Sequence, residues 1–131
     1  MDKTLQALFA LLRAGLWSRA DEAMASVFPL SGQEWERVYD IACQQTVAGI
    51  AFRGLEWLPE GTEPPMGLMA KWMARVDRIE RSNEAMNAAV ARLYGHFSAH
   101  GVEAVLQKGQ GIAMMYPEPL VRESGDVDLY F

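Results

Sequence analysis

Two aspartates near the end of the chain have the spacing of a metal-binding pair. Asp126 and Asp128 lie in the segment GDVDLYF, which alternates acidic and apolar residues as a strand does. Side chains alternate between the faces of a strand, so both carboxylates would share one face, about 7 Å apart along the backbone. Carboxylate oxygens suit magnesium, which completes its shell with water and substrate phosphates. The alternative is an exposed strand with a polar face, because D-x-D is a common pattern.

The position of the pair favours the metal site. Aspartate is depleted in strands, yet both aspartates directly precede the apolar run Leu129, Tyr130 and Phe131. Residues placed against local propensity often mark function. We therefore expect Asp126 and Asp128 to bind Mg²⁺ or Mn²⁺.

A second candidate for chemistry is the segment LQKGQG, where a strand should end and a helix should begin. Free amides at a helix N-terminus, with a glycine that admits a close approach of the backbone, form a phosphate site. Lys108 adds a point charge, and the amide of Gly109 or Gln110 would approach the phosphates. The segment has neither a P-loop nor a complete dinucleotide fingerprint, so a tight turn with a solvated lysine is the alternative.

Arg122 is a further candidate for a phosphate contact. It lies in the loop that precedes the two aspartates, beside the expected site. The guanidinium group pairs well with phosphate oxygens. A surface arginine paired with Glu118 or Glu123 is the alternative.

Helical spacing dominates the first hundred residues. A first helix is predicted by apolar residues at intervals of three and four, namely Leu5, Leu8, Phe9, Leu12 and Leu16. A short second helix over about residues 18–27 should stop before Pro29, because the residue preceding a proline is pushed out of helical geometry. Ser31 and Glu34 form a capping box at which a third helix should begin.

Two further helices have predicted inward faces. That of the third helix comprises Trp35, Val38, Tyr39, Ala42, Cys43 and Thr46. After a loop over residues 59–65, a long helix has the apolar positions Met66, Met69, Met73, Val76, Ile79, Met86, Val90, Leu93 and Phe97. Its other side carries Lys71, Arg75, Arg78 and Arg81, which we interpret as a solvated face balanced by neighbouring acids.

The periodicity changes after Gly101. The run VEAVL predicts a buried strand near residues 102–107, and DVDLYF predicts a second strand near residues 126–131. The predicted fold class is therefore α+β. A helical region over residues 1–100 would be followed by the start of an α/β core over residues 101–131, in one continuous domain.

The segments with candidate chemistry follow a set order along the chain: a strand, K-G, a short helix, Y-P-x-P, an arginine, and G-D-x-D before an apolar strand. These positions are Lys108, Gly109, Tyr116, Pro117, Pro119, Arg122, Gly125, Asp126 and Asp128. The order resembles the uncharacterised nucleotidyltransferase-like proteins of bacteria, a branch of the polymerase-beta-like nucleotidyltransferase superfamily. Its specific part covers about residues 102–131, and the preceding helices resemble the family's amino-terminal part less specifically.

The resemblance implies the first two strands of a nucleotidyltransferase-type sheet, with the glycine turn facing a triphosphate and the catalytic Asp126 and Asp128 holding magnesium. It implies transfer of a nucleoside monophosphate to a hydroxyl of an unknown acceptor. The superfamily usually has glycine or serine where this chain has Gln110. A third carboxylate lies on a later strand in the superfamily, and this chain ends at Phe131. We therefore expect an incomplete domain, weakly active or inactive alone.

A different class of function stays open, namely a catalytically silent fragment that serves as a helical interaction module. In either case the last strand would present an unpaired apolar edge, and we expect the chain to self-associate through that edge or to cover it with a helix. A carboxylate on a strand beyond Phe131 would favour the enzyme over the module. The sequence therefore leaves open whether this chain acts as an enzyme by itself.

Composition limits the partners. The 131 residues are 50% hydrophobic and 22% charged, as in a globular domain. The net charge of −5 gives no broad attraction to nucleic-acid phosphates or anionic lipid. No apolar run approaches the roughly 18 residues of a spanning helix, and the single Cys43 cannot form an internal disulfide. We expect a cytoplasmic protein without a membrane partner.

Overall fold

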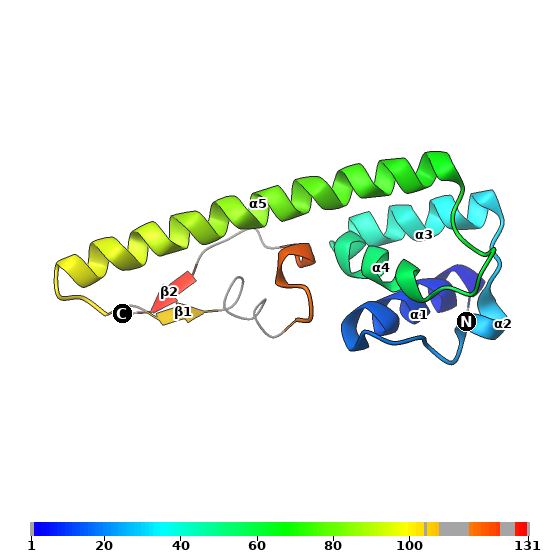
Figure 1. Ribbon diagram of the computed structural model, residues 1–131, viewed down its shortest axis with the longest axis horizontal. Coiled ribbons are helices and arrows are strands. Elements are labelled where there is room, and N and C mark those ends of the chain that lie inside the picture. Colours follow the sequence, from blue (N-terminus) through cyan, green and yellow to red (C-terminus); the bar gives the residue numbers. More distant parts are fainter. Residues whose placement is uncertain (1, 104, 108–115, 124–127, 131) are drawn as a thin grey trace. The chain divides into compact units, whose positions relative to one another are not determined.

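The computed structural model describes residues 2–103, 105–107, 116–123 and 128–130. The chain divides into two compact units, Met1–Asp77 and Arg78–Phe131. The first unit contains α1 (Lys3–Trp17), α2 (Met24–Val27), α3 (Gly32–Gln44), α4 (Ala48–Gly54), the 3-10 helix η1 (Leu55–Trp57) and the start of α5 (Met66–Ala99). The second unit contains the rest of α5, β1 (Val105–Gln107), the 3-10 helix η2 (Pro119–Val121) and β2 (Asp128–Tyr130) (Figure 1). Among the described helices, none combines the length and the apolar character needed to cross a membrane.

In the first unit, α1 and α4 pack with their backbones in contact. A Cβ atom added to Gly15 would lie 2.2 Å from the carbonyl oxygen of Ile50, and one added to Gly54 would lie 2.0 Å from that of Leu11. Only glycine permits backbones to approach so closely. The two glycines therefore set the distance between these helices.

This close contact explains why the predicted inward face of α1 is only partly correct. The buried residues are mostly small, namely Thr4, Ala7, Leu8, Ala10, Leu11, Ala14 and Gly15. Leu8 is buried as predicted, whereas Phe9 is 39% exposed. A large side chain cannot enter a contact between two backbones, so the face with the small residues turns inward.

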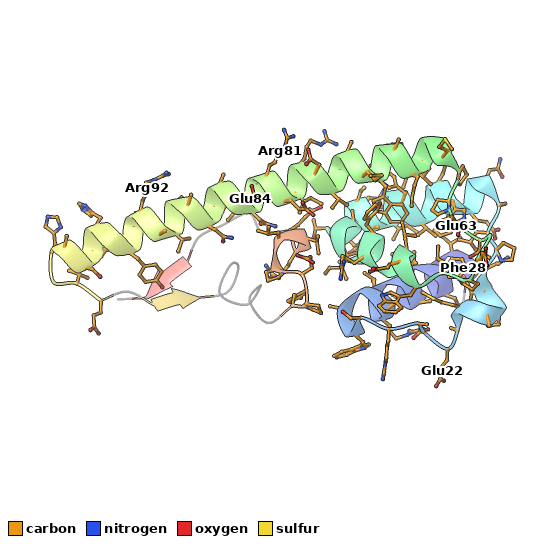
Figure 2. All side chains as sticks on the ribbon, in the orientation of Figure 1. Glu22, Phe28, Glu63, Arg81, Glu84 and Arg92 are labelled. Carbon is orange, nitrogen blue, oxygen red and sulfur yellow. The ribbon has the colours of Figure 1, made fainter. Side chains whose placement is uncertain are left out.

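Aromatic rings form much of the core of the first unit. Trp35 and Trp72 are 1% and 0% exposed, and their ring centroids lie 6.4 Å apart. Phe28, which Figure 2 labels, stacks on Trp35 at 5.4 Å. The indole nitrogen of Trp72 donates a hydrogen bond to the carbonyl of Ala48 at 2.9 Å. The prediction for α3 is confirmed at four positions, which are Trp35, Val38, Tyr39 and Ala42, and is wrong at the exposed Thr46.

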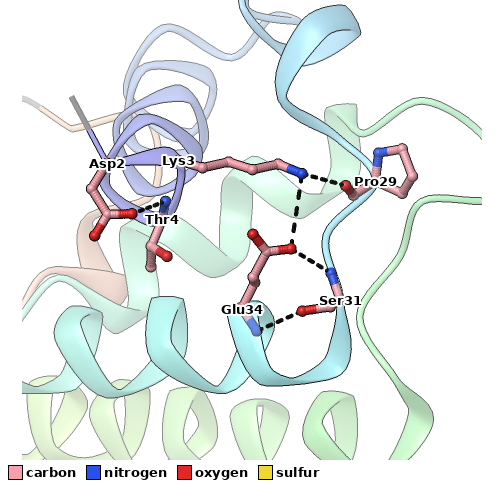
Figure 3. A network of polar contacts seen from close by, with 6 residues as sticks. All are labelled: Asp2, Lys3, Thr4, Pro29, Ser31 and Glu34. Carbon is pink, nitrogen blue, oxygen red and sulfur yellow. Dashed lines mark hydrogen bonds and ion pairs between the residues drawn. The ribbon is translucent and has the colours of Figure 1, made fainter.

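The predicted capping box at the start of α3 is confirmed. The amide of Glu34 donates to Oγ of Ser31 at 3.1 Å, and the amide of Ser31 donates to Oε1 of Glu34 at 2.8 Å (Figure 3). Lys3 lies beside the box, with its Nζ 3.8 Å from the same carboxylate. The amide of Ser31 is the main reason that the pKa of Glu34 lies below its ordinary value.

The lowered pKa predicts a pH-dependent contribution to stability. Above the ordinary pKa of about 4.5 the ionised Glu34 stabilises the fold, and this contribution is lost as the pH falls through the lower folded-state pKa. In Glu34→Gln the amide oxygen still accepts from Ser31, but the charge is gone. The free energy of unfolding, measured in urea, should therefore favour the wild type at pH 7, with a difference that shrinks toward about pH 3.

Ser31→Ala is the matched control, because it removes the other half of the box and no titrating group. It should lower the free energy of unfolding by about 1 kcal/mol at pH 7, and this loss should change less toward pH 3 than that of Glu34→Gln, because the Ser31 hydroxyl is only a smaller cause of the lowered Glu34 pKa. The pKa values of Asp2 and Asp21 are lowered too, but they are common to all three proteins and cancel in the comparison. A difference for Glu34→Gln that stays constant with pH would contradict the electrostatic explanation.

The inward face of α5 differs from the predicted one. Its buried positions are Leu68, Trp72, Val76, Ile79, Asn83 and Val90. The prediction is confirmed at Val76, Ile79 and Val90. It is wrong at Met66, Met73 and Leu93, which are 88%, 56% and 39% exposed. Burying a tryptophan removes more apolar area from water than burying a methionine. The face of α5 that carries Trp72 is therefore the one that is buried.

The predicted fold class, α+β with the first strands of a nucleotidyltransferase-type sheet, is wrong. Across the described residues helices dominate, and strand pairing is limited to an antiparallel ribbon of three residues in each strand. Part of the reason is the end of α5. Gly101 has φ +74, and the amide of Val102 donates back to the carbonyl of Phe97 at 2.8 Å. This helix-ending motif uses the residues that were predicted to begin the first strand.

Candidate functional site

The ribbon of β1 and β2 contains part of each of the two segments that the sequence singles out for chemistry. The two strands lie side by side (Figure 1), and their register places Val105 opposite Tyr130 and Gln107 opposite Asp128. Gln107 directly precedes Lys108 in the sequence, and Asp128 is the first residue of β2. Because the strands are antiparallel, the end of β1 and the start of the aspartate strand meet at one end of the ribbon.

Two of the predicted site residues, Asp128 and Arg122, lie in the described part of the chain. Asp128 begins β2, and Arg122 follows η2 directly with an extended backbone. The others lie outside the described residues, namely Lys108, Gly109, Gln110 and Asp126. Their roles stay predictions. The residues that the structure describes contain no group of three or more His, Cys, Asp or Glu side chains that could hold a metal ion.

A buried asparagine holds the loop that leads to the aspartate strand. Asn83 of α5 is 1% exposed, and its Nδ2 donates to the carbonyls of Leu120 at 2.5 Å and Arg122 at 2.7 Å. An amide nitrogen carries two hydrogens, so one side chain can serve both carbonyls. Val121, between these carbonyls, is 4% exposed. The segment from Leu120 to Arg122 is therefore held to α5 by the two hydrogen bonds of Asn83.

The sequence interpretation missed Asn83, although one signal was present. Asn83 falls four residues after Ile79 on the stripe of α5 that becomes buried. Asparagine is a poor helix former and is costly to bury without partners. A polar residue on an apolar stripe therefore indicates a buried hydrogen bond, but the stripe itself was misplaced by the exposed methionines.

The side chain of Arg122 rests against Tyr116. Cζ of the guanidinium lies 5.8 Å from the centroid of the phenol ring, within the range of a cation–π contact. Both residues belong to the motif Y-P-x-P-x-x-R. The backbone of Arg122 is thus held by Asn83 and its side chain is supported by Tyr116, four residues before Asp126 in the sequence.

The family of this chain follows from comparison with known families. Residues 31–131 match the model of a family described as "Uncharacterised nucleotidyltransferase". The chain belongs to this nucleotidyltransferase family. The predicted resemblance is therefore confirmed. No curated protein and no solved structure matches the chain.

The nucleotidyltransferase match extends well beyond the segment with the specific motifs. It begins at Ser31 of the capping box and includes α3, α4, α5 and both strands. Asn83, Tyr116, Arg122 and Asp128 all lie inside it. The helix that carries Asn83 and the loop that Asn83 holds therefore both lie within the matched region.

Proposed function

We propose that this protein transfers a nucleoside monophosphate from a nucleoside triphosphate to a hydroxyl group, in a reaction that depends on Mg²⁺ or Mn²⁺. Membership of the nucleotidyltransferase family supports the reaction class. The observation that carries the assignment of residues is the pairing of Gln107 with Asp128. It brings the strand that leads into Lys108 beside the strand that begins with an aspartate.

Asp126 and Asp128 are the proposed ligands of the cation. Their oxygens are the hard donors that Mg²⁺ takes, and their spacing of two residues is the one that an extended chain would place on one face. The bound cation would neutralise charge on the phosphates and on the attacking and leaving oxygens. The carboxylates themselves need a cation between them, since two adjacent negative charges repel each other.

The positively charged side chains and the backbone amides near the aspartates in the sequence are the proposed phosphate-binding groups. Arg122 offers a planar fork of N–H donors, Lys108 a point charge, and Gly109 and Gln110 their backbone amides. These groups hold the triphosphate with its α-phosphorus facing the acceptor hydroxyl. The hydroxyl oxygen forms a bond to that phosphorus and loses its proton, while the bond to the bridging oxygen breaks and pyrophosphate leaves. The acceptor stays open.

The test is the double substitution Asp126→Asn with Asp128→Asn. It keeps the side-chain volumes and removes the charge that attracts the cation. Transfer should fall by about 100-fold or more. Transfer is measured as label moved from α-³²P triphosphates to acceptors in a cell extract. Mn²⁺ binding is measured separately by electron paramagnetic resonance, which requires no acceptor.

Glu84→Gln is the control, because Glu84 is an exposed carboxylate on α5 in the same unit (Figure 2). It should leave Mn²⁺ binding and transfer unchanged. Wild-type levels of both in a folded double variant would overturn the assignment of the aspartates. A wild-type protein that binds neither Mn²⁺ nor a triphosphate would instead favour the interaction module.

A further inference from the structure

We propose that Asn83 is a positioning residue for the triphosphate, acting through Arg122. The inference rests on the proposed function, because it takes Arg122 as a phosphate ligand. It goes further by naming a residue on α5, outside every motif of the sequence, that determines how tightly the nucleotide binds.

The first step concerns the backbone of Arg122. Asn83 Nδ2 holds the carbonyls on both sides of Val121, where the chain leaves η2. Arg122 has φ −79 and ψ 120, so the backbone is extended there, four residues before Asp126 in the sequence. Asn83 is 1% exposed, and water therefore has little access to compete for these carbonyls. The Cα position of Arg122 is fixed relative to α5.

The second step concerns the guanidinium. With its backbone held, the arginine side chain lies against Tyr116, with Cζ 5.8 Å from the ring centroid. Arginine loses considerable rotamer freedom when it binds a ligand, and a side chain that is already ordered loses less. The two supports therefore place the charge before the triphosphate arrives. Without Asn83, the loop and the arginine would become ordered only when the triphosphate binds, and the binding free energy would be less favourable.

A simpler role for Asn83 is to satisfy two carbonyls and stabilise the second unit. The two roles differ in how Asn83 and Arg122 combine. If Asn83 acts through Arg122, its effect on nucleotide affinity must vanish once the guanidinium is absent. Its effect on stability must persist, because Arg122→Ala keeps the backbone carbonyl that Asn83 binds.

The experiment is a double-mutant cycle of Asn83→Leu and Arg122→Ala in the whole protein. Dissociation constants for ATP, GTP, CTP and UTP with Mn²⁺ are measured by calorimetry, and melting temperatures by circular dichroism. Asn83→Leu should weaken binding of the preferred triphosphate by about tenfold in the wild type. It should have no further effect on that constant in the Arg122→Ala background, while lowering the melting temperature in both.

Tyr116→Leu repeats the cycle without touching the buried amide, in case Asn83→Leu does not fold. It should also weaken binding only when Arg122 is present. Arg92→Ala, which removes an exposed arginine that points away from α5 (Figure 2), should leave the affinity unchanged. If Asn83→Leu and Tyr116→Leu bind the triphosphate as tightly as the wild type, or if their effects on the dissociation constant add fully to that of Arg122→Ala, the positioning role of Asn83 is overturned. The proposed function is not affected by that outcome. A wild-type protein that binds no triphosphate overturns this inference together with the proposed function.

Discussion

Gly54→Ala is expected to destabilise the first unit by about 3 kcal/mol or more, because the new methyl group has no room. Its Cβ would lie 2.0 Å from the carbonyl oxygen of Leu11 and 2.8 Å from the Cα of that residue. These are backbone atoms of α1, which cannot rotate away as a flexible side chain can. The two helices must move apart, and the packing across their whole contact is loosened. The loss is measured by urea unfolding followed by circular dichroism.

Gly67→Ala is the matched control in the same unit. Gly67 lies in the first turn of α5, and nothing lies within 4 Å of a Cβ added there. Because alanine favours the helix more than glycine does, this variant should be neutral or more stable by up to about 1 kcal/mol. Wild-type stability in Gly54→Ala would show that α1 and α4 do not approach as closely as the structure indicates.

The same contact shows what the sequence could predict about the helices and what it could not. The beginning of α3 was predictable because the signal of a capping box is local, with Ser31 and Glu34 three residues apart. The inward face of α1 was not, since the pattern gave weight to large apolar residues such as Phe9. The decisive residues are Gly15 and Gly54, which lie on different helices and gain their meaning only when the helices meet.

The boundary between α5 and β1 was misplaced for a related reason. Gly101 was correctly interpreted as a break, but the strand was expected to begin at once. The amides of Gly101 and Val102 instead donate to the carbonyls of Ser98 and Phe97 and complete the helix end. The residues directly after a helix can complete its C-terminal cap, so the next strand begins later. The apolar pattern alone does not distinguish a cap residue from the first residue of a strand.

For the candidate site, the sequence predicted the family but did not reveal that Asn83 holds the loop of Arg122. The order of short motifs along residues 102–131 predicted the family, and the family model matches residues 31–131. Asn83, by contrast, binds two carbonyl groups that lie 37 and 39 residues away. Every residue has a carbonyl, so the partners of such a bond leave no trace in the sequence. Only the fold shows which carbonyls come within reach.

Trp72→Ala is expected to lower the free energy of unfolding by about 3–5 kcal/mol, through the cavity that it leaves in the aromatic core. The indole is 0% exposed, and its ring centroid lies 5.4 Å from Tyr39 and 6.0 Å from Phe52. Trp72→Phe keeps most of these ring contacts but removes the donor to the carbonyl of Ala48, and should lose about 1 kcal/mol for that bond in addition to a smaller cavity.

Trp17→Phe is the control for the urea titrations of both variants, because Trp17 is 65% exposed and should lose almost nothing. The order of stability therefore tests the core directly: wild type and Trp17→Phe together, then Trp72→Phe, then Trp72→Ala. Trp72→Phe as unstable as Trp72→Ala would mean that the hydrogen bond to Ala48, and not the packing of rings, dominates at this position. If Trp72→Ala is as stable as the wild type, the result contradicts the burial of Trp72 against α3 and α4 in the first unit. It would favour the alternative in which the methionine face of α5 is turned inward, because removal of an exposed tryptophan costs little.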